Sequence, residues 1–119
     1  MYKPIFKTML ILTKEVLKAF NKQGYTGDKQ TKDIKIVLKL FNPYGAGTWY
    51  LYEKESEDIF WGFVNLGDSE MAECGTVSMS ELMSLRLPMG LKIERDMRFK
   101  PLSISLEEVI NKVKKGEHV

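Results

Sequence analysis

Two carboxylates spaced two residues apart, Glu94 and Asp96, come closer to a catalytic pattern than any other residues of this chain. On an extended segment such side chains point to the same side. They could therefore share a divalent cation of the kind that metal-dependent nucleases use. The rest of a ligand set is not evident in the sequence. A metal-dependent, nuclease-like enzyme is thus the last-ranked of three hypotheses, and we assign no catalytic, cofactor-binding or metal-binding residue.

Nucleophilic catalysis finds little support in the residue types available. The only histidine is His118, one residue from the end of the sequence, and the only cysteine is Cys74. A catalytic triad or a histidine-rich metal site needs histidines that the sequence does not offer. No internal histidine is available to activate Cys74 as a nucleophile. We expect Cys74 to be a small buried residue of a strand.

A glycine-rich stretch, NPYGAG at residues 42–47, raises the question of a phosphate-binding loop. Such a loop follows a strand and opens a helix whose N–H groups point at the anion. Here the glycines lead into aromatic, strand-forming residues, and no Lys-Ser or Lys-Thr pair follows Gly47. The stretch therefore matches neither the P-loop motif nor the dinucleotide-binding motif. We interpret the stretch as a hairpin turn in which Gly45 and Gly47 permit positive φ.

Aromatic residues after this turn could stack on bases, as they do in proteins that bind single-stranded nucleic acid. Strand alternation places Tyr50 and Tyr52 on one face, and Trp49 and Leu51 on the other. Residues 40–84 contain a single lysine and no arginine, whereas nucleic-acid platforms carry basic residues among the aromatic ones. Packing in the core or across strands is therefore favoured. Tyr50 and Tyr52 remain candidates for contact with a partner on a partly exposed face.

Charge is distributed unevenly along the chain. Residues 1–39, 40–84 and 85–119 carry formal charges of +6, −7 and +3, which together give the net charge of +2. Such segregation can mark a surface for a partner. Alternatively, the three segments pack together and neutralise one another. The sequence leaves both readings open.

An acidic turn is predicted at residues 55–58. Its carboxylates, Glu55, Glu57 and Asp58, match no EF-hand spacing, so a solvated turn is favoured over a site for a hard cation. We take these three residues as candidates for binding a partner, because they could compete with nucleic acid for a basic groove.

A charged string, IERDMRFKP, follows in the last third of the chain. If it is extended, Arg95 shares one side with apolar residues that include Met97, while Glu94, Asp96 and Arg98 project to the other side. An arginine among apolar neighbours must find a carboxylate or carbonyl groups, because burying it unpaired is costly. We favour an internal ion-pair network that fixes this segment against the sheet. The alternative is a recognition cluster formed by Glu94, Asp96 and Arg98.

Hydrophobic periodicity and capping residues predict an α+β fold in a single domain over residues 1–119. Thr13, Ser78 and Ser105 are placed as helix N-caps. The predicted helices cover residues 14–23, a short stretch after Ser78, and about 106–115. The predicted strands cover residues 34–41, 48–53, 59–66 and 71–77, with an extended segment at 90–101. Short connections between consecutive strands indicate antiparallel pairing, so we expect a four-stranded meander with an N-terminal helix, a short helix after the last strand and a C-terminal helix.

Several motifs, taken in order, resemble a known family. They are Trp49-Tyr50, Gly62 in an aromatic strand, Ser78-x-Ser80-Glu81-Leu82 and Ile93-Glu94-Arg95-Asp96. From about residue 13 to 101, the chain is similar to the bacterial mobile-element family catalogued as domain of unknown function 2958. The resemblance implies an intracellular protein carried by conjugative plasmids and related elements, often near antirestriction and partition genes. It assigns no catalytic residue, because none is established for the family.

These observations together predict a small non-enzymatic binding protein of a plasmid, phage or other mobile element. Its partner would be a host or element-encoded protein, and binding would modulate a nucleic-acid-directed defence of the antirestriction or anti-CRISPR type. The alternative is a nucleic-acid-binding accessory protein that uses basic residues near both ends of the chain, namely Lys14, Lys18, Lys22, Lys35, Lys39, Arg95, Arg98 and Lys100. We expect a cytoplasmic location, no cofactor and no membrane partner, since the chain has one cysteine and no long apolar run.

Overall fold

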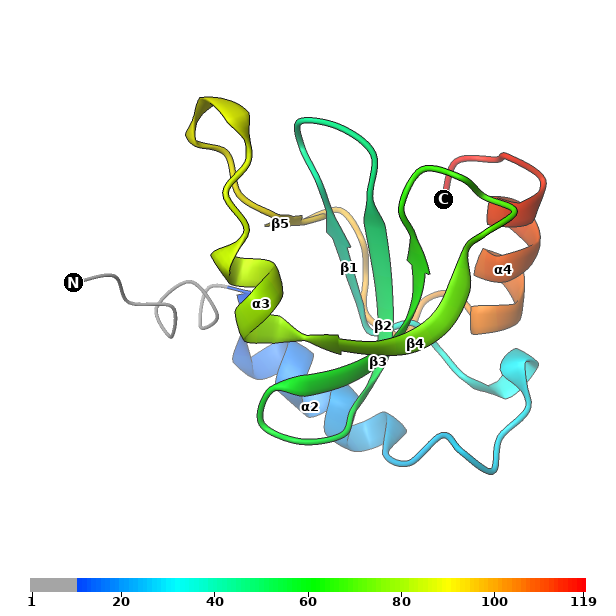
Figure 1. Ribbon diagram of the computed structural model, residues 1–119. Coiled ribbons are helices and arrows are strands. Elements are labelled where there is room, and N and C mark those ends of the chain that lie inside the picture. Colours follow the sequence, from blue (N-terminus) through cyan, green and yellow to red (C-terminus); the bar gives the residue numbers. More distant parts are fainter. Residues whose placement is uncertain (1–10) are drawn as a thin grey trace.

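The computed structural model describes residues 11–119, which form an α+β fold built on an antiparallel sheet (Figure 1). The strands are β1 (Leu38–Phe41), β2 (Thr48–Lys54), β3 (Ile59–Asn65), β4 (Glu73–Ser78) and β5 (Glu94–Arg95). The helices are α2 (Lys14–Gln23), α3 (Met79–Ser84) and α4 (Leu106–Lys114), with short 3-10 turns at η1 (Thr31–Asp33) and η2 (Pro88–Gly90). The sheet order is β4-β3-β2-β1-β5, so β4 and β5 form its two edges.

The three predicted helices are confirmed, together with the residues that begin them. Thr13 Oγ1 accepts a hydrogen bond from the Val16 N–H, and the hydroxyls of Ser78 and Ser105 each accept one from the residue three positions on. These side chains satisfy N–H groups that the first helical turn leaves unpaired. Gly24, with φ of 66°, ends α2 in the left-handed region.

The sheet has five strands, so the predicted four-stranded meander is incomplete. The additional strand, β5, pairs antiparallel with β1 through Leu40 opposite Arg95 and Phe41 opposite Glu94. The predicted extended segment supplies only this short strand, because Asp96 then turns the chain: its Oδ1 accepts from the Arg98 N–H at 2.9 Å. The turn breaks the alternation, and Met97 is exposed rather than packed on the apolar side.

The strand predicted over residues 34–41 joins the sheet only from Leu38 onward. Its first half pairs instead with the irregular chain before α4. Ile36 donates its N–H to Ile104 O at 2.9 Å and accepts from the Leu102 N–H at 2.8 Å. Main-chain groups of Ile34 and Ile36 are therefore satisfied by a segment remote in sequence, which ties the start of α4 to the sheet.

The two faces of the sheet carry separate apolar clusters. Trp49 and Leu51 lie in a cluster with α2 and α3, whereas Tyr50 and Tyr52 lie in a cluster with α4. The strand alternation predicted for these four residues is thus observed. Because both faces are packed against helices, the exposed side chains lie in the loops, along the sheet edges and on the outer sides of the helices.

Candidate functional site

The eight predicted partner-binding residues lie in three separate parts of the fold. Glu55, Glu57 and Asp58 belong to the β2–β3 hairpin, and Glu94, Asp96 and Arg98 belong to β5 and the turn after it. Tyr50 and Tyr52 lie inside the α4-facing cluster, with 4% and 6% of their surface exposed. Burial raises the pKa of both tyrosines. These two side chains therefore present almost no surface to a partner.

Asp58 has a structural role that the sequence did not reveal. Its carboxylate accepts hydrogen bonds from the Ser78 hydroxyl and from both the N–H and the hydroxyl of Ser80. The hydrogen bond from Ser78 lowers the pKa of Asp58; slight burial opposes this and the bonds from Ser80 assist it. Asp58 therefore joins the β2–β3 hairpin to the first turn of α3.

The other two acids of this hairpin are more available. Glu55 accepts a hydrogen bond from Trp61 Nε1 at 2.7 Å and remains exposed. Glu57 is fully exposed, and its carboxylate lies 3.5 Å from Lys54 Nζ. A pair of this kind contributes little to stability because water and salt screen it.

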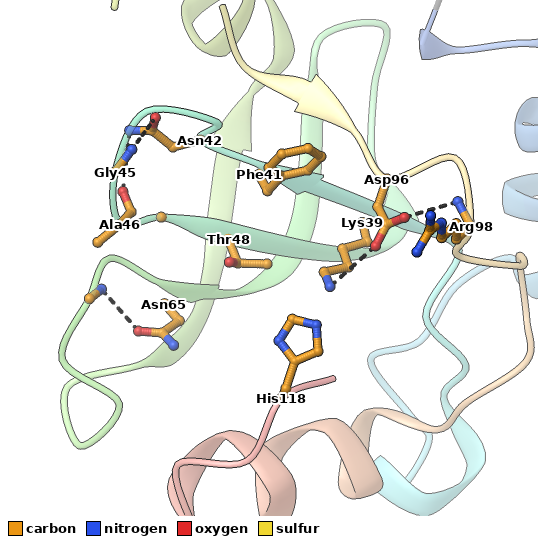
Figure 2. A pocket seen from close by; sticks show the side chains of 12 residues that line it. Lys39, Phe41, Asn42, Gly45, Ala46, Thr48, Asn65, Asp96, Arg98 and His118 are labelled. Atoms are coloured by element: carbon orange, nitrogen blue, oxygen red, sulfur yellow. Dashed lines mark hydrogen bonds and ion pairs between the residues drawn. The ribbon is translucent and has the colours of Figure 1, made fainter.

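A polar pocket of about 610 Å³ lies where the β1–β2 loop, the turn after β5 and the C-terminal tail meet (Figure 2). Lys39 is buried at its base, and its Nζ lies 3.3 Å from Asp96 Oδ2. The same ammonium donates to the main-chain oxygen of Val119 and lies 5.8 Å from the centre of the Tyr50 ring. Arg98 and His118 also line the pocket, and both are exposed.

Asp96 is held in its ionised form by this arrangement. Partial burial raises the pKa of Asp96, but hydrogen bonds from the Arg98 N–H and the Lys39 ammonium lower it, and the net pKa lies below the ordinary carboxyl value. The buried charge of Lys39 is thereby compensated, as burial requires. This pair fixes the IERDMRFKP string to β1, although the partner expected from the sequence was one for Arg95.

Arg95 forms a second ion pair, which is longer than the pair between Lys39 and Asp96. Its side chain is largely buried, and Nη2 lies 3.9 Å from Glu15 Oε1 on α2. The Glu15 side chain, however, is 75% exposed, so water screens the pair. Arg95 thus fixes β5 to α2 through the packing of its stem as well as through its charge.

The glycine-rich loop at residues 42–47 forms the predicted hairpin turn. The Asn42 side-chain oxygen accepts from the N–H groups of Tyr44 and Gly45, at 2.8 and 3.0 Å. Gly47 has φ of 136°, which residues with a side chain rarely adopt. Two N–H groups that a phosphate would need are therefore already bonded to Asn42.

A metal site is not formed by the residues that the structure describes. No group of three or more His, Cys, Asp or Glu side chains within residues 11–119 could hold an ion. Asp96 is engaged by Lys39, and Glu94, two positions earlier on β5, is exposed. In the same part of the chain, no helix is long and apolar enough to cross a membrane.

Cys74 corrects one expectation from the sequence, because it is exposed rather than buried. It lies on β4, an edge strand, opposite Phe63 of β3. Partial desolvation raises the pKa of the Cys74 thiol, a hydrogen bond with the Tyr52 hydroxyl lowers it, and nearby Glu73 raises it; the net shift is upward. A thiol of this kind is a poor nucleophile at neutral pH.

An apolar groove of about 610 Å³, which no sequence pattern indicated, lies beside the edge strand β4. Leu66, Met71 and Leu85 line it and are 68%, 74% and 44% exposed. Trp49 and Gly75 also line it. Exposed apolar side chains gathered around a hollow are a usual mark of a protein-binding surface.

Acidic side chains surround this groove. Asp68 and Glu73 line it, and Glu70 lies between them on the exposed β3–β4 loop. Residues 55–81, which run from the β2–β3 hairpin into α3, contain seven acidic residues and no lysine or arginine. We call β4 and the β3–β4 loop, with Asp68, Glu70 and Glu73, the acidic edge. The sequence feature that indicates the acidic edge is the complete lack of basic residues over residues 55–81.

A family model described as "Protein of unknown function (DUF2958)" matches residues 11–118. The chain belongs to this family. The matched range contains every described helix and strand, including α4. Searches of curated proteins and of solved structures find no match. Membership in this family leaves the activity open, so a function must be argued from the surfaces described above.

Proposed function

We propose that this DUF2958 protein is a non-enzymatic binding protein whose acidic edge contacts a basic surface on a partner protein. The observation that carries this proposal is the run of seven acidic residues without a basic one over residues 55–81, of which Asp68 and Glu73 line an apolar groove. Charge of one sign speeds association with a surface of opposite sign and rejects surfaces of the same sign. Apolar side chains within the charged rim then supply the contact area.

The partner class follows from this charge. An acidic surface repels the phosphate backbone of nucleic acids but suits the basic grooves with which other proteins bind them. We therefore propose a partner that itself binds nucleic acid. Within the mobile-element setting that the family resemblance implied, such a partner would be a host or element-encoded defence protein in the cytoplasm, of the restriction or CRISPR type. Binding would block its nucleic-acid groove.

A matched pair of charge variants tests the proposal. The first variant, Asp68→Asn/Glu70→Gln/Glu73→Gln, neutralises the acidic edge. The control variant, Asp28→Asn/Asp33→Asn/Glu107→Gln, changes the net charge equally at exposed positions elsewhere. Phage plating on hosts that carry a defined restriction or CRISPR system is measured with each variant expressed.

We expect the wild type and the control to raise plating efficiency on at least one such host, and the edge variant to lose the effect. Equal plating with all three proteins on every host would contradict a defence-directed function. Equal protection by the wild type and the edge variant would contradict a role for the acidic edge.

Nucleic-acid binding remains the alternative because α2 carries an exposed row of lysines at helical spacing. Lys14, Lys18 and Lys22 are each four residues apart and exposed. Two of the other basic residues suggested by the sequence are committed elsewhere, since Lys39 pairs with Asp96 and Arg95 with Glu15. A salt titration with labelled single- and double-stranded DNA and RNA tests this alternative. Submillimolar affinity that falls steeply with salt would favour it.

A further inference from the structure

We propose that β4 receives an extended segment of the partner protein as an additional strand, whose apolar side chains fill the groove beside Gly75. This inference rests on the proposed function, because it names how the acidic edge would be used. The segment would be basic and apolar in alternation. Main-chain hydrogen bonds to β4 would supply affinity, and the groove and the acidic rim would supply specificity.

The first observation is that β4 is an unprotected edge. Within residues 11–119, β4 is the last strand of the sheet order and pairs only with β3. Its register with β3 contains no bulge, and its sequence, ECGTVS, contains no lysine or proline. Natural edge strands normally carry such features to prevent pairing with another chain. β4 therefore presents unpaired main-chain N–H and C=O groups at alternate residues along its length.

The second observation concerns two glycines that face each other. Gly75 on β4 lies opposite Gly62 on β3, so this cross-strand pair has no side chains. A Cβ atom at Gly62 would meet Leu51 Cδ2 at 2.5 Å, which shows that Leu51 occupies that space. A Cβ atom at Gly75 would meet nothing within 4 Å. The sheet therefore has an open place at Gly75, directly on the edge strand.

The third observation is that the groove has a fixed wall. The β3–β4 loop carries Leu66 and Met71, and Lys114 of α4 holds its end by donating to Glu70 O at 3.0 Å and Ala72 O at 2.7 Å. Leu85, just after α3, lies on the groove as well. A preformed groove reduces the ordering that binding must impose.

Charge decides which occupant fits. An incoming strand would run beside Asp68, Glu70 and Glu73, so lysine or arginine side chains of that strand would be attracted. A second copy of this chain would place two acidic edges against each other, and nucleic acid would be repelled. An extended basic segment of about six residues matches both the length of β4 and its charge.

The test uses a defined peptide, acetyl-(Val-Lys)₄-amide, with two controls. One control replaces every lysine by glutamate. The other carries N-methyl groups on alternate residues, which removes the N–H groups that would donate to β4. Amide signals of the ¹⁵N-labelled protein are followed during titration. We expect shifts concentrated at residues 73–78 and around Leu66, Met71 and Leu85, with binding weakened at least about tenfold for each control peptide.

A protein variant tests the contribution of the groove to peptide binding separately from that of the charge. Gly75→Trp places an indole into the open space of the groove, and we expect it to leave the fold intact and to weaken peptide binding at least about tenfold. The control is Gly45→Trp, at a second glycine whose Cβ would meet nothing, on the β1–β2 loop and outside the residues that line the groove. We expect the control to bind like wild type. Its amide spectrum and that of Gly75→Trp should both show a folded protein.

The outcomes distinguish this inference from the proposed function. Suppose that Gly75→Trp still protects phage and binds the peptide like wild type, while the Asp68, Glu70 and Glu73 triple variant loses protection. Strand addition would then be wrong, and the charge contact would stand. Shifts located away from β4, or sedimentation showing self-association through this edge, would equally overturn the inference.

Discussion

Lys39 and Asp96 form an ion pair of 3.3 Å that joins β1 to the turn after β5. The pair lies at the base of the polar pocket, and the Lys39 side chain is only 8% exposed. The most charged string of the sequence therefore meets the rest of the protein through an internal contact. The Asp96 carboxylate also accepts a hydrogen bond from the Arg98 N–H, and this bond forms the turn in which the Arg98 side chain is exposed.

Removal of the Asp96 carboxylate should destabilise the protein. Asp96→Ala leaves the buried Lys39 ammonium with only the Val119 oxygen and the Tyr50 ring, so the free energy of unfolding should fall by about 1.5–3 kcal/mol. Urea unfolding at neutral pH measures this. Lys39→Met combined with Asp96→Ala should recover part of the loss, since no unpaired charge then remains buried. A single variant as stable as wild type would show that water compensates Lys39.

Arg95 should act more through packing than through charge. Arg95→Ala should lower the free energy of unfolding by about 1–2 kcal/mol, because the buried stem is lost. Glu15→Gln removes the charge of its exposed partner and should cost less than about 0.5 kcal/mol. Arg95→Met keeps most of the stem and should fall between them. If Glu15→Gln costs as much as Arg95→Ala, the pair is stronger than its exposure implies.

The facing glycines should respond oppositely to alanine. Gly62→Ala forces a methyl group against Leu51 and the Tyr50 carbonyl oxygen, with an expected cost of about 1–3 kcal/mol. Gly75→Ala meets nothing and should stabilise the protein by up to about 1 kcal/mol, because alanine has less backbone freedom to lose in the unfolded chain. Thermal or urea unfolding measures the stability of the two variants relative to wild type. Equal destabilisation by both would mean that the space at Gly75 is not open.

Acid should weaken the link between the β2–β3 hairpin and α3. The folded pKa of Asp58 is lowered, so its contribution is present above its unfolded pKa of about 4 and is lost as pH falls through the lower folded value. At pH 7, Asp58→Asn should therefore be less stable than wild type by about 1 kcal/mol. At pH 3 the two proteins should differ less. Urea unfolding at both pH values measures this, and a constant difference would contradict an ionised Asp58.

Local signals predicted much of this fold. The hydroxyls of Thr13, Ser78 and Ser105 cap helices because the N–H groups they satisfy lie only three residues away. The β1–β2 hairpin is likewise determined by residues within its own turn, where Asn42 bonds to Tyr44 and Gly45. Information of this kind is contained in a short window of sequence, so it can be read without knowing the tertiary structure.

Features that depend on distant residues were missed. β5 has two residues, too few for a periodic pattern, and exists because β1 offers a free edge to Glu94 and Arg95. The groove depends on the register that places Gly62 opposite Gly75, which no local pattern fixes. Asp58 looked like a solvated acid because the hydroxyls it binds lie about twenty positions further along the chain.

The pairing of residues 34–36 with residues 102–106 bears on how the chain reaches this fold. Strands β1 to β4 are joined by short loops, so their contacts can form early and at low entropic cost. The hydrogen bonds of Ile36 with Leu102 and Ile104 instead close residues 36–104, more than half of the described chain, into one loop. Contacts of such high sequence separation slow folding. The meander should therefore assemble first, with β5 and α4 docking last and leaving first when the protein unfolds.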